Sequence, residues 1–166
     1  MQLVICAARS YLARFGAPQT LEDLASHRCR AFRRPATRQI LPWYLLIHGE
    51  IQHRHVAPTL STNDTELESQ AVLAGQMIGQ ISNLSAARYI RDGHLVPVLL
   101  QHITAHIGVH LYYGSGSARP KRVRAFIDLA IERLTDTPHY VLTEKELAQA
   151  AAEKRKSIKR KRRATR

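Results

Sequence analysis

The chain has 166 residues, 45% of them hydrophobic, which is enough for one domain of the α/β or α+β type. No apolar run is long enough for a membrane span or a signal peptide, and Cys6 and Cys29 form no disulfide framework. These features argue against membrane-spanning and disulfide-rich secreted proteins, so we expect a cytoplasmic protein with free, buried thiols. The net charge is +12, and residues 139–166 carry seven of these charges.

The first part of the chain alternates short apolar runs with helix-favouring segments. Residues 3–8 (LVICAA) are predicted as a buried strand, and a short helix follows in which Ser10 is the expected N-cap and Gly16 the end. Thr20 is the expected N-cap of a second short helix. A strand is predicted at CRAFRR and a loop at PATRQI.

The middle of the chain predicts a hairpin followed by a capped helix. Residues 43–47 and 51–60 flank the tripeptide HGE, which is typical of a hairpin connection. Thr62 or Asn63 is the expected N-cap of the next helix, with Glu66 at capping-box spacing from Asn63. The expected apolar face of this helix consists of Leu67, Ala71 and Ala74.

The second half continues with short elements. Gly75 is the expected end of the preceding helix, and MIGQI is predicted as a strand in which Gly79 permits a close approach. Gly93 ends a further helix, and LVPVLL and HIGVHLYYG are predicted strands. Pro120 suits the first turn of a last helix. The apolar face of that helix comprises Val123, Phe126, Ile127, Ala130 and Leu134.

The end of the chain, from Leu142, favours a helix and then becomes strongly basic. Its densest cluster is Lys159, Arg160, Lys161, Arg162 and Arg163. Such a cluster neutralises phosphates without reading sequence, or it is a solvated tail. The absence of aromatic residues among these charges favours the solvated tail, because stacking defines single-strand sites.

Metal-binding and catalytic patterns are weak. His102, His106 and His110 are evenly spaced, but the segment alternates like a strand, and no cysteine or carboxylate completes a ligand set. A polar strand face is the simpler interpretation. There is no nucleophile elbow, P-loop or HExxH motif. We therefore predict no metal, no cofactor and no enzymatic activity.

Four segments carry motifs in a particular order. They are CAARSYLARFGAPQTLEDLASHRC, LSTNDTELESQAVLAGQMIGQIS, GHLVPVL and RPKRVRAFIDLAIERL. The first combines a strand with Ser-x-Tyr-Leu, Gly-x-Pro, Asp-Leu and His. In order and spacing, residues 3–134 resemble the effector-binding domain of LysR-type transcriptional regulators. His94 stands where that family usually has Arg.

The resemblance implies an α/β fold of the periplasmic-binding-protein-like type II class, with two lobes. It implies that residues 2–95 form lobe II, 96–138 the returning strands and helix of lobe I, and 139–166 a basic tail. The family's helix-turn-helix, linker helix and first half of lobe I have no counterpart here. We therefore expect a truncated gene, a misplaced start or a deliberately shortened chain, and the sequence does not choose among them. The last helix would then expose Phe126, Ile127 and Leu134, which favours oligomers or aggregation.

The resemblance also indicates where an effector would bind. In such folds the ligand lies at the carboxyl ends of strands, near helix N-termini that attract anions. The candidate residues are Ser61, Thr62 and Asn63 at the helix start, Gln80 and Ser82 at the next strand, and Arg33 after CRAF. The alternative is that the helix-start residues are caps only.

The functional hypothesis is a LysR-family fragment that binds a small-molecule effector, with a carboxylate as the favoured class. Its expected partners are further copies of itself or a full-length regulator. DNA would be bound only through the missing helix-turn-helix, or weakly through the tail. The alternative is a small basic nucleic-acid-associated protein that acts through its C-terminal tail.

Overall fold

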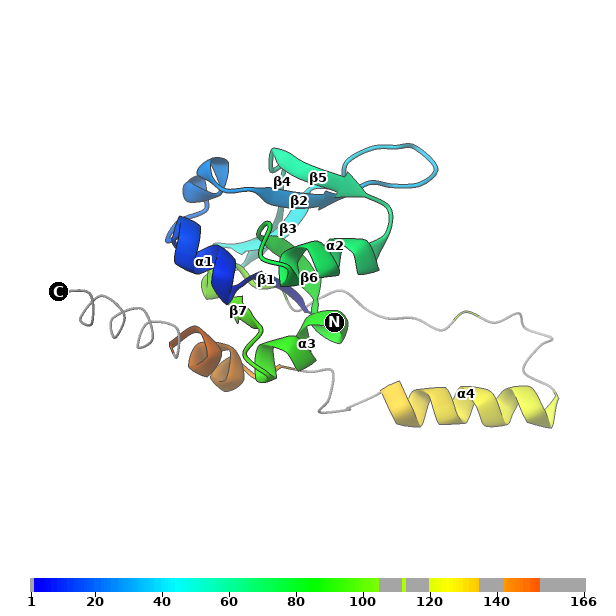
Figure 1. Ribbon diagram of the computed structural model, residues 1–166. Coiled ribbons are helices and arrows are strands. Elements are labelled where there is room, and N and C mark those ends of the chain that lie inside the picture. Colours follow the sequence, from blue (N-terminus) through cyan, green and yellow to red (C-terminus); the bar gives the residue numbers. More distant parts are fainter. Residues whose placement is uncertain (1, 105–111, 113–119, 135–141, 153–166) are drawn as a thin grey trace.

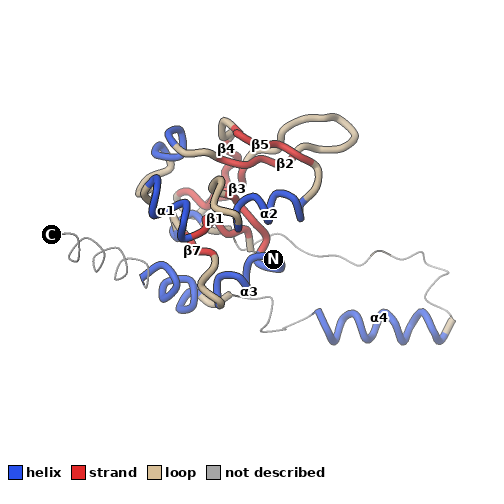
Figure 2. Tube along the Cα trace, in the orientation of Figure 1, coloured by secondary structure: helices blue, strands red, loops and turns tan. Residues whose placement is uncertain are grey.

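The computed structural model describes residues 2–104, 112, 120–134 and 142–152 (Figures 1 and 2). The strands are β1 (Leu3–Ala8), β2 (Cys29–Phe32), β3 (Trp43–Ile47), β4 (Glu50–Arg54), β5 (Pro58–Thr62), β6 (Gly79–Ser82) and β7 (Leu95–Pro97). The helices are α1 (Arg9–Phe15), α2 (Thr65–Leu73), α3 (Asn83–Arg91) and α4 (Lys121–Leu134), with 3₁₀ helices η1 (Glu22–Ser26) and η2 (Leu100–His102). The predicted mixed α/β class is confirmed.

The central sheet is built around β1, which pairs antiparallel with β6 on one side and β7 on the other. β2 pairs with β5 in parallel, and a parallel bridge between Cys29 and Ile78 places β2 beside β6. The strands β5, β2 and β6 therefore run in the same direction, and their carboxyl ends lie at one edge. β3 and β4 form a separate antiparallel hairpin.

Both faces of β1 are buried, as its continuous apolar sequence predicts. Val4, Cys6 and Ala8 belong to one hydrophobic cluster, with residues of α2 and α3. Ile5 and Ala7 belong to a second cluster on the other face, with residues of α1 and β3. The strand thus separates two cores and contacts both.

The predicted start of the first helix is wrong. β1 runs directly into α1, whose N-cap position is Ala8 without a side-chain hydrogen bond, so Ser10 lies inside the helix. Gly16 ends this helix as predicted, with φ of 82° and its N–H donated to the Leu12 carbonyl. The Thr20 hydroxyl accepts the Asp23 N–H at 3.4 Å, although the helical turn itself begins later, at Glu22.

The predicted second arm of the hairpin is also wrong in extent. β4 ends at Arg54, and β5 is an independent strand. Because β5 pairs in parallel with β2, the chain has to leave the hairpin between residues 54 and 58. The weak alternation of polar and apolar residues in this region concealed that change of partner.

The N-cap of α2 is Asp64, not Thr62 or Asn63. Its carboxylate accepts the N–H groups of Glu66 and Leu67 at 2.9 and 3.1 Å. The predicted capping box of Asn63 and Glu66 is therefore wrong. β5 extends through Thr62, so the helix begins later in the chain than predicted. The predicted apolar face is also rotated, since Leu67 is 52% exposed. The buried residues of α2 are Glu68, Ser69, Ala71 and Val72.

The later strands and the last helix agree with the prediction only in part. β7 contains three residues, and most of the strand predicted at HIGVHLYYG lies outside the described residues. In α4 Phe126 is 61% exposed, as predicted, whereas Ile127 is only 8% exposed and contradicts the prediction. The side chain of Leu134 lies outside the described part of the chain.

The segment before the basic cluster packs on the domain. Residues 144–152 are helical, and Leu142 and Leu147 are 1% and 4% exposed in the cluster that contains Ala86, Ile90 and Leu95. Figure 1 shows this helix beside α3 and β7. Thr143 and Glu146 form a capping box, because the Thr143 N–H donates to the Glu146 carboxylate and its hydroxyl accepts the Glu146 N–H.

Replacing Leu147 by Ala is expected to lower the free energy of unfolding by about 2–4 kcal/mol, because truncation of a buried leucine leaves a cavity. The matched control is Leu84→Ala, at a residue of α3 that is 43% exposed, where a change below about 1 kcal/mol is expected. Urea unfolding followed by circular dichroism measures both. Equal effects of the two substitutions would contradict the packing of Leu147.

Glu146 should make stability depend on acid pH. Hydrogen bonds from Arg91 and from the Thr143 N–H lower the pKa of Glu146 from 4.5 to about 2. Because this folded-state pKa lies below the unfolded value, the carboxylate stabilises the fold above pH 4.5 and loses this effect as pH falls toward 2. Its side chain is 36% exposed, so solvent screening limits the contribution to about 1 kcal/mol or less.

Glu146→Gln is therefore expected to lower the free energy of unfolding at pH 7, and the difference from the unaltered protein should shrink toward pH 3. Glu144→Gln, at the exposed carboxylate one half-turn earlier, is the control and should show no such convergence. A difference that grew on acidification would contradict this account.

Candidate effector-binding edge

Arg33 and Ser61 meet at the edge where β2 and β5 end. The Arg33 Nη2 donates to the Ser61 Oγ at 2.6 Å, and the Arg33 N–H donates to the Thr62 carbonyl at 2.8 Å. The parallel register pairs Ala31 with Ser61 and Phe32 with Thr62, so Arg33 follows directly at the end of this ladder. The Arg33 guanidinium is thereby fixed at one end and presented on the surface, because Arg33 is exposed.

The amino end of α2 has its first N–H donors already paired. The Thr62 hydroxyl accepts the Asp64 N–H at 3.1 Å, and the Asp64 carboxylate accepts two more N–H groups of the first turn. Asn63 is exposed between them. The anion site expected from the helix terminus is thus filled by a carboxylate of the chain itself, and Arg33 supplies positive charge at this edge.

Gln80 is 4% exposed and joins β6 to the hairpin. Its Oε1 accepts the Tyr44 N–H at 3.0 Å, and its Nε2 donates to the Tyr44 carbonyl at 2.6 Å. The side-chain amide imitates the backbone of a neighbouring strand. Both of its polar atoms are used inside the protein, so its evident role is to hold β3 against the sheet.

Ser82 and Asn83 close the same edge from the side of β6. The Ser82 hydroxyl is the N-cap of α3 and accepts the Leu84 N–H at 3.1 Å. The Asn83 Oδ1 accepts the Gln2 N–H at 3.0 Å, while the Asn83 N–H donates to the Gln2 carbonyl at 2.9 Å. The sequence missed the role of Asn83, although its position after a predicted strand end was a usable signal.

A buried ion pair lies between β2 and α2. The Arg30 Nη1 donates to the Glu68 Oε2, with the two side chains 12% and 2% exposed. Burial raises the pKa of the Glu68 carboxyl, and the Arg30 guanidinium opposes this rise. Gly79 permits this packing, because a Cβ there would lie 2.7 Å from the Val72 Cγ2 and 3.3 Å from the Arg30 Cγ.

The remaining predicted residues are not brought to this edge by the described structure. Lys159, Arg160, Lys161, Arg162 and Arg163 lie outside the described residues, as do His106 and His110. Within the described ranges, no three His, Cys, Asp or Glu side chains are grouped so that they could hold a metal ion. No helix in that part of the chain is long and apolar enough to cross a membrane.

The model for the LysR substrate binding domain matches residues 1–135. The chain belongs to this family. LysR relatives include the uncharacterized HTH-type transcriptional regulator YcaN of Escherichia coli K12, which is 30% identical over 128 residues, covering 77% of this chain and 41% of that protein. CrgA of Neisseria meningitidis serogroup C (strain 8013) is 28% identical over 132 residues, 78% of this chain and 43% of its own. The chain spans less than half the length of these curated relatives.

Solved LysR structures share the fold. The CrgA regulatory domain from Neisseria meningitidis superposes with a TM-score of 0.67 at 27% identity, over 81% of this chain and 66% of that one. The regulatory domain of AphB from Vibrio vulnificus, at 24% identity and a TM-score of 0.56, supports the fold alone. The predicted periplasmic-binding-protein-like class is thereby confirmed.

The LysR motifs named in the sequence have identifiable structural uses. The hydroxyl of Tyr11, from the Ser-x-Tyr-Leu motif, accepts the Arg28 N–H at 3.0 Å and pairs with the His27 Nδ1 at 3.1 Å. This contact joins α1 to the start of β2. The motif residues Tyr11 and His27 therefore position β2, the strand that ends at Phe32, directly before Arg33.

Both thiols are buried, as predicted, and burial raises the pKa of Cys6 to about 12 and that of Cys29 to about 11. Both groups are therefore protonated at pH 8, and only thiolates attack disulfide reagents rapidly. We expect the native protein to react slowly with Ellman's reagent and both thiols to react at once in guanidinium chloride.

The positive control for thiol labelling is Ala13→Cys, at an exposed residue of α1. This variant should gain one rapidly reacting thiol in the native state. Rapid labelling of the unaltered native protein would contradict the burial of Cys6 and Cys29.

Proposed function

We propose that the chain is the ligand-sensing part of a LysR-type transcriptional regulator that binds a small carboxylate effector. The observation that carries this proposal is the Arg33–Ser61 hydrogen bond at the shared carboxyl edge of β2 and β5. Arginine presents a planar set of donors that matches a carboxylate, and a charge-assisted pair of this kind is strong. The family match over residues 1–135 supports this assignment.

The proposed direct contacts are Arg33, Ser61 and Asn63, with Thr62 holding the backbone between them. Gln80 and Ser82 belong to the site as residues that fix its walls, because their polar atoms bond within the chain. Asp64 adds a negative charge beside the site. An effector with one carboxylate near Arg33 and a neutral or cationic group near Asp64 satisfies both charges.

Effector binding would act on transcription through assembly with further copies or with a full-length regulator, in which DNA is contacted by the helix-turn-helix of this family. The proposed location is the cytoplasm, where such regulators meet DNA. The proposed activity is binding and not catalysis, in keeping with a family of transcriptional regulators.

A thermal-shift screen of small mono- and dicarboxylates tests the site. An effector should raise the melting temperature, and Arg33→Gln should weaken its binding about tenfold or more, because a charge-assisted hydrogen bond is lost. The matched control is Arg124→Gln, at an exposed arginine of α4, which should bind like the unaltered protein.

Isothermal titration calorimetry of the best carboxylate supplies the affinities. A carboxylate that binds Arg33→Gln and the unaltered protein equally well would contradict the proposed contact. If none of the carboxylates in the panel binds, the proposed effector class is contradicted.

A further inference from the structure

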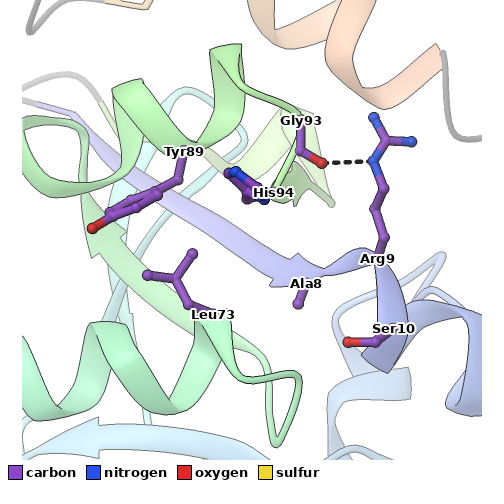
Figure 3. A pocket seen from close by; sticks show the side chains of 7 residues that line it. All are labelled: Ala8, Arg9, Ser10, Leu73, Tyr89, Gly93 and His94. Carbon is purple, nitrogen blue, oxygen red and sulfur yellow. Dashed lines mark hydrogen bonds between the residues drawn. The ribbon is translucent and has the colours of Figure 1, made fainter.

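A pocket of about 430 Å³ lies at the end of β1 that is opposite the Arg33 edge. It is formed where the end of β1, the start of α1, the last residue of α2, the last turns of α3 and the turn before β7 come together (Figure 3). Its volume falls within the range of about 300–1,000 Å³ that is usual for small-molecule sites.

One wall of the pocket is apolar. Ala8 is 4% exposed, and Leu73 and Tyr89 pack against the cluster that also contains Leu147. The guanidinium carbon of Arg88 lies 5.1 Å from the centroid of the Tyr89 ring, so a cation–π contact restrains that ring. This wall is therefore suited to the flat or aliphatic body of an organic molecule.

The other wall is polar and basic. It consists of Arg9, Ser10 and His94, and Figure 3 shows the His94 ring between Tyr89 and Arg9. The Arg9 Nε donates to the Gly93 carbonyl at 2.6 Å, which fixes the guanidinium beside the turn that carries His94. None of the described residues that line this pocket is acidic.

We propose that this pocket binds a small aromatic carboxylate. Its ring would lie against Leu73 and Tyr89, and its carboxylate would accept hydrogen bonds from His94 and the Ser10 hydroxyl, with Arg9 adding positive charge. Buried apolar area supplies the affinity, and the polar groups fix the orientation. This site lies at the other end of β1 from the Arg33 edge and does not depend on the function proposed there.

Titration of the full chain with benzoate, followed by ¹H–¹⁵N NMR, tests this site. Saturable shifts are expected at the backbone amides of Ser10, Gly93 and His94, with a dissociation constant of millimolar order or tighter. Acetate, which lacks the ring, should bind several times more weakly, because it cannot cover the apolar wall.

Two substitutions of His94 separate the loss of its hydrogen-bond donor from a change in the shape of its side chain. His94→Ala should weaken benzoate binding about fivefold or more, whereas His94→Arg should retain it, because arginine also donates to a carboxylate. The matched control is His55→Ala, at an exposed histidine remote from the pocket, which should bind like the unaltered protein.

Four results would overturn the proposal. They are the absence of saturable shifts at Ser10, Gly93 and His94, shifts confined to the Arg33 edge, equal affinity for acetate and benzoate, and unchanged affinity in His94→Ala. Because the readout is resolved by residue, benzoate binding at the Arg33 edge is recognised separately.

Discussion

The burial of β1 on both faces is the constraint on which the rest of this structure depends. The strand pairs along both edges and contributes side chains to two hydrophobic clusters, so it has no position that tolerates an unpaired polar group. Polar chemistry is therefore displaced to the two ends of the sheet. One end carries Arg33, Ser61 and Ser82, and the other carries Arg9, Ser10 and His94, which explains why the two proposed sites are separate.

Most polar side chains near the Arg33 edge are used to hold the fold. Asp64 and Ser82 cap helices, Gln80 pairs with the Tyr44 backbone, and Asn83 pairs with Gln2. These partners keep the strand ends and helix starts in fixed positions. In the function proposed above, few groups at this edge remain to recognise a ligand, with Arg33 first among them, and discrimination then depends mainly on where charge is placed.

The sequence predicted the strand at residues 3–8, the helix-ending glycines and the family, because apolar runs and glycine positions depend on local chemistry. It failed where the outcome depended on a partner. Asn63 and Asp64 are both good caps, and only the length of β5 decides between them. Gln80 was predicted as a ligand contact because it lies at the end of a strand, and that role stays a prediction. Its pairing with Tyr44 was not visible in the sequence, because it joins segments far apart along the chain. The packing of Leu142 and Leu147 was hidden by the neighbouring lysines and arginines, although the Thr143–Glu146 spacing was visible.

The packing of residues 142–152 on the domain also affects how the chain can fold while it is being synthesised. β1 emerges from the ribosome well before its hydrogen-bonding partners β6 and β7, which follow more than seventy residues later. Long-range pairing of this kind folds slowly. Leu142 and Leu147 emerge later still and cover Ala86, Ile90 and Leu95. A nascent chain therefore exposes the apolar surface of Ala86, Ile90 and Leu95 until residues 142–147 have been synthesised, and exposed apolar surface of this kind is typical of chaperone-bound intermediates.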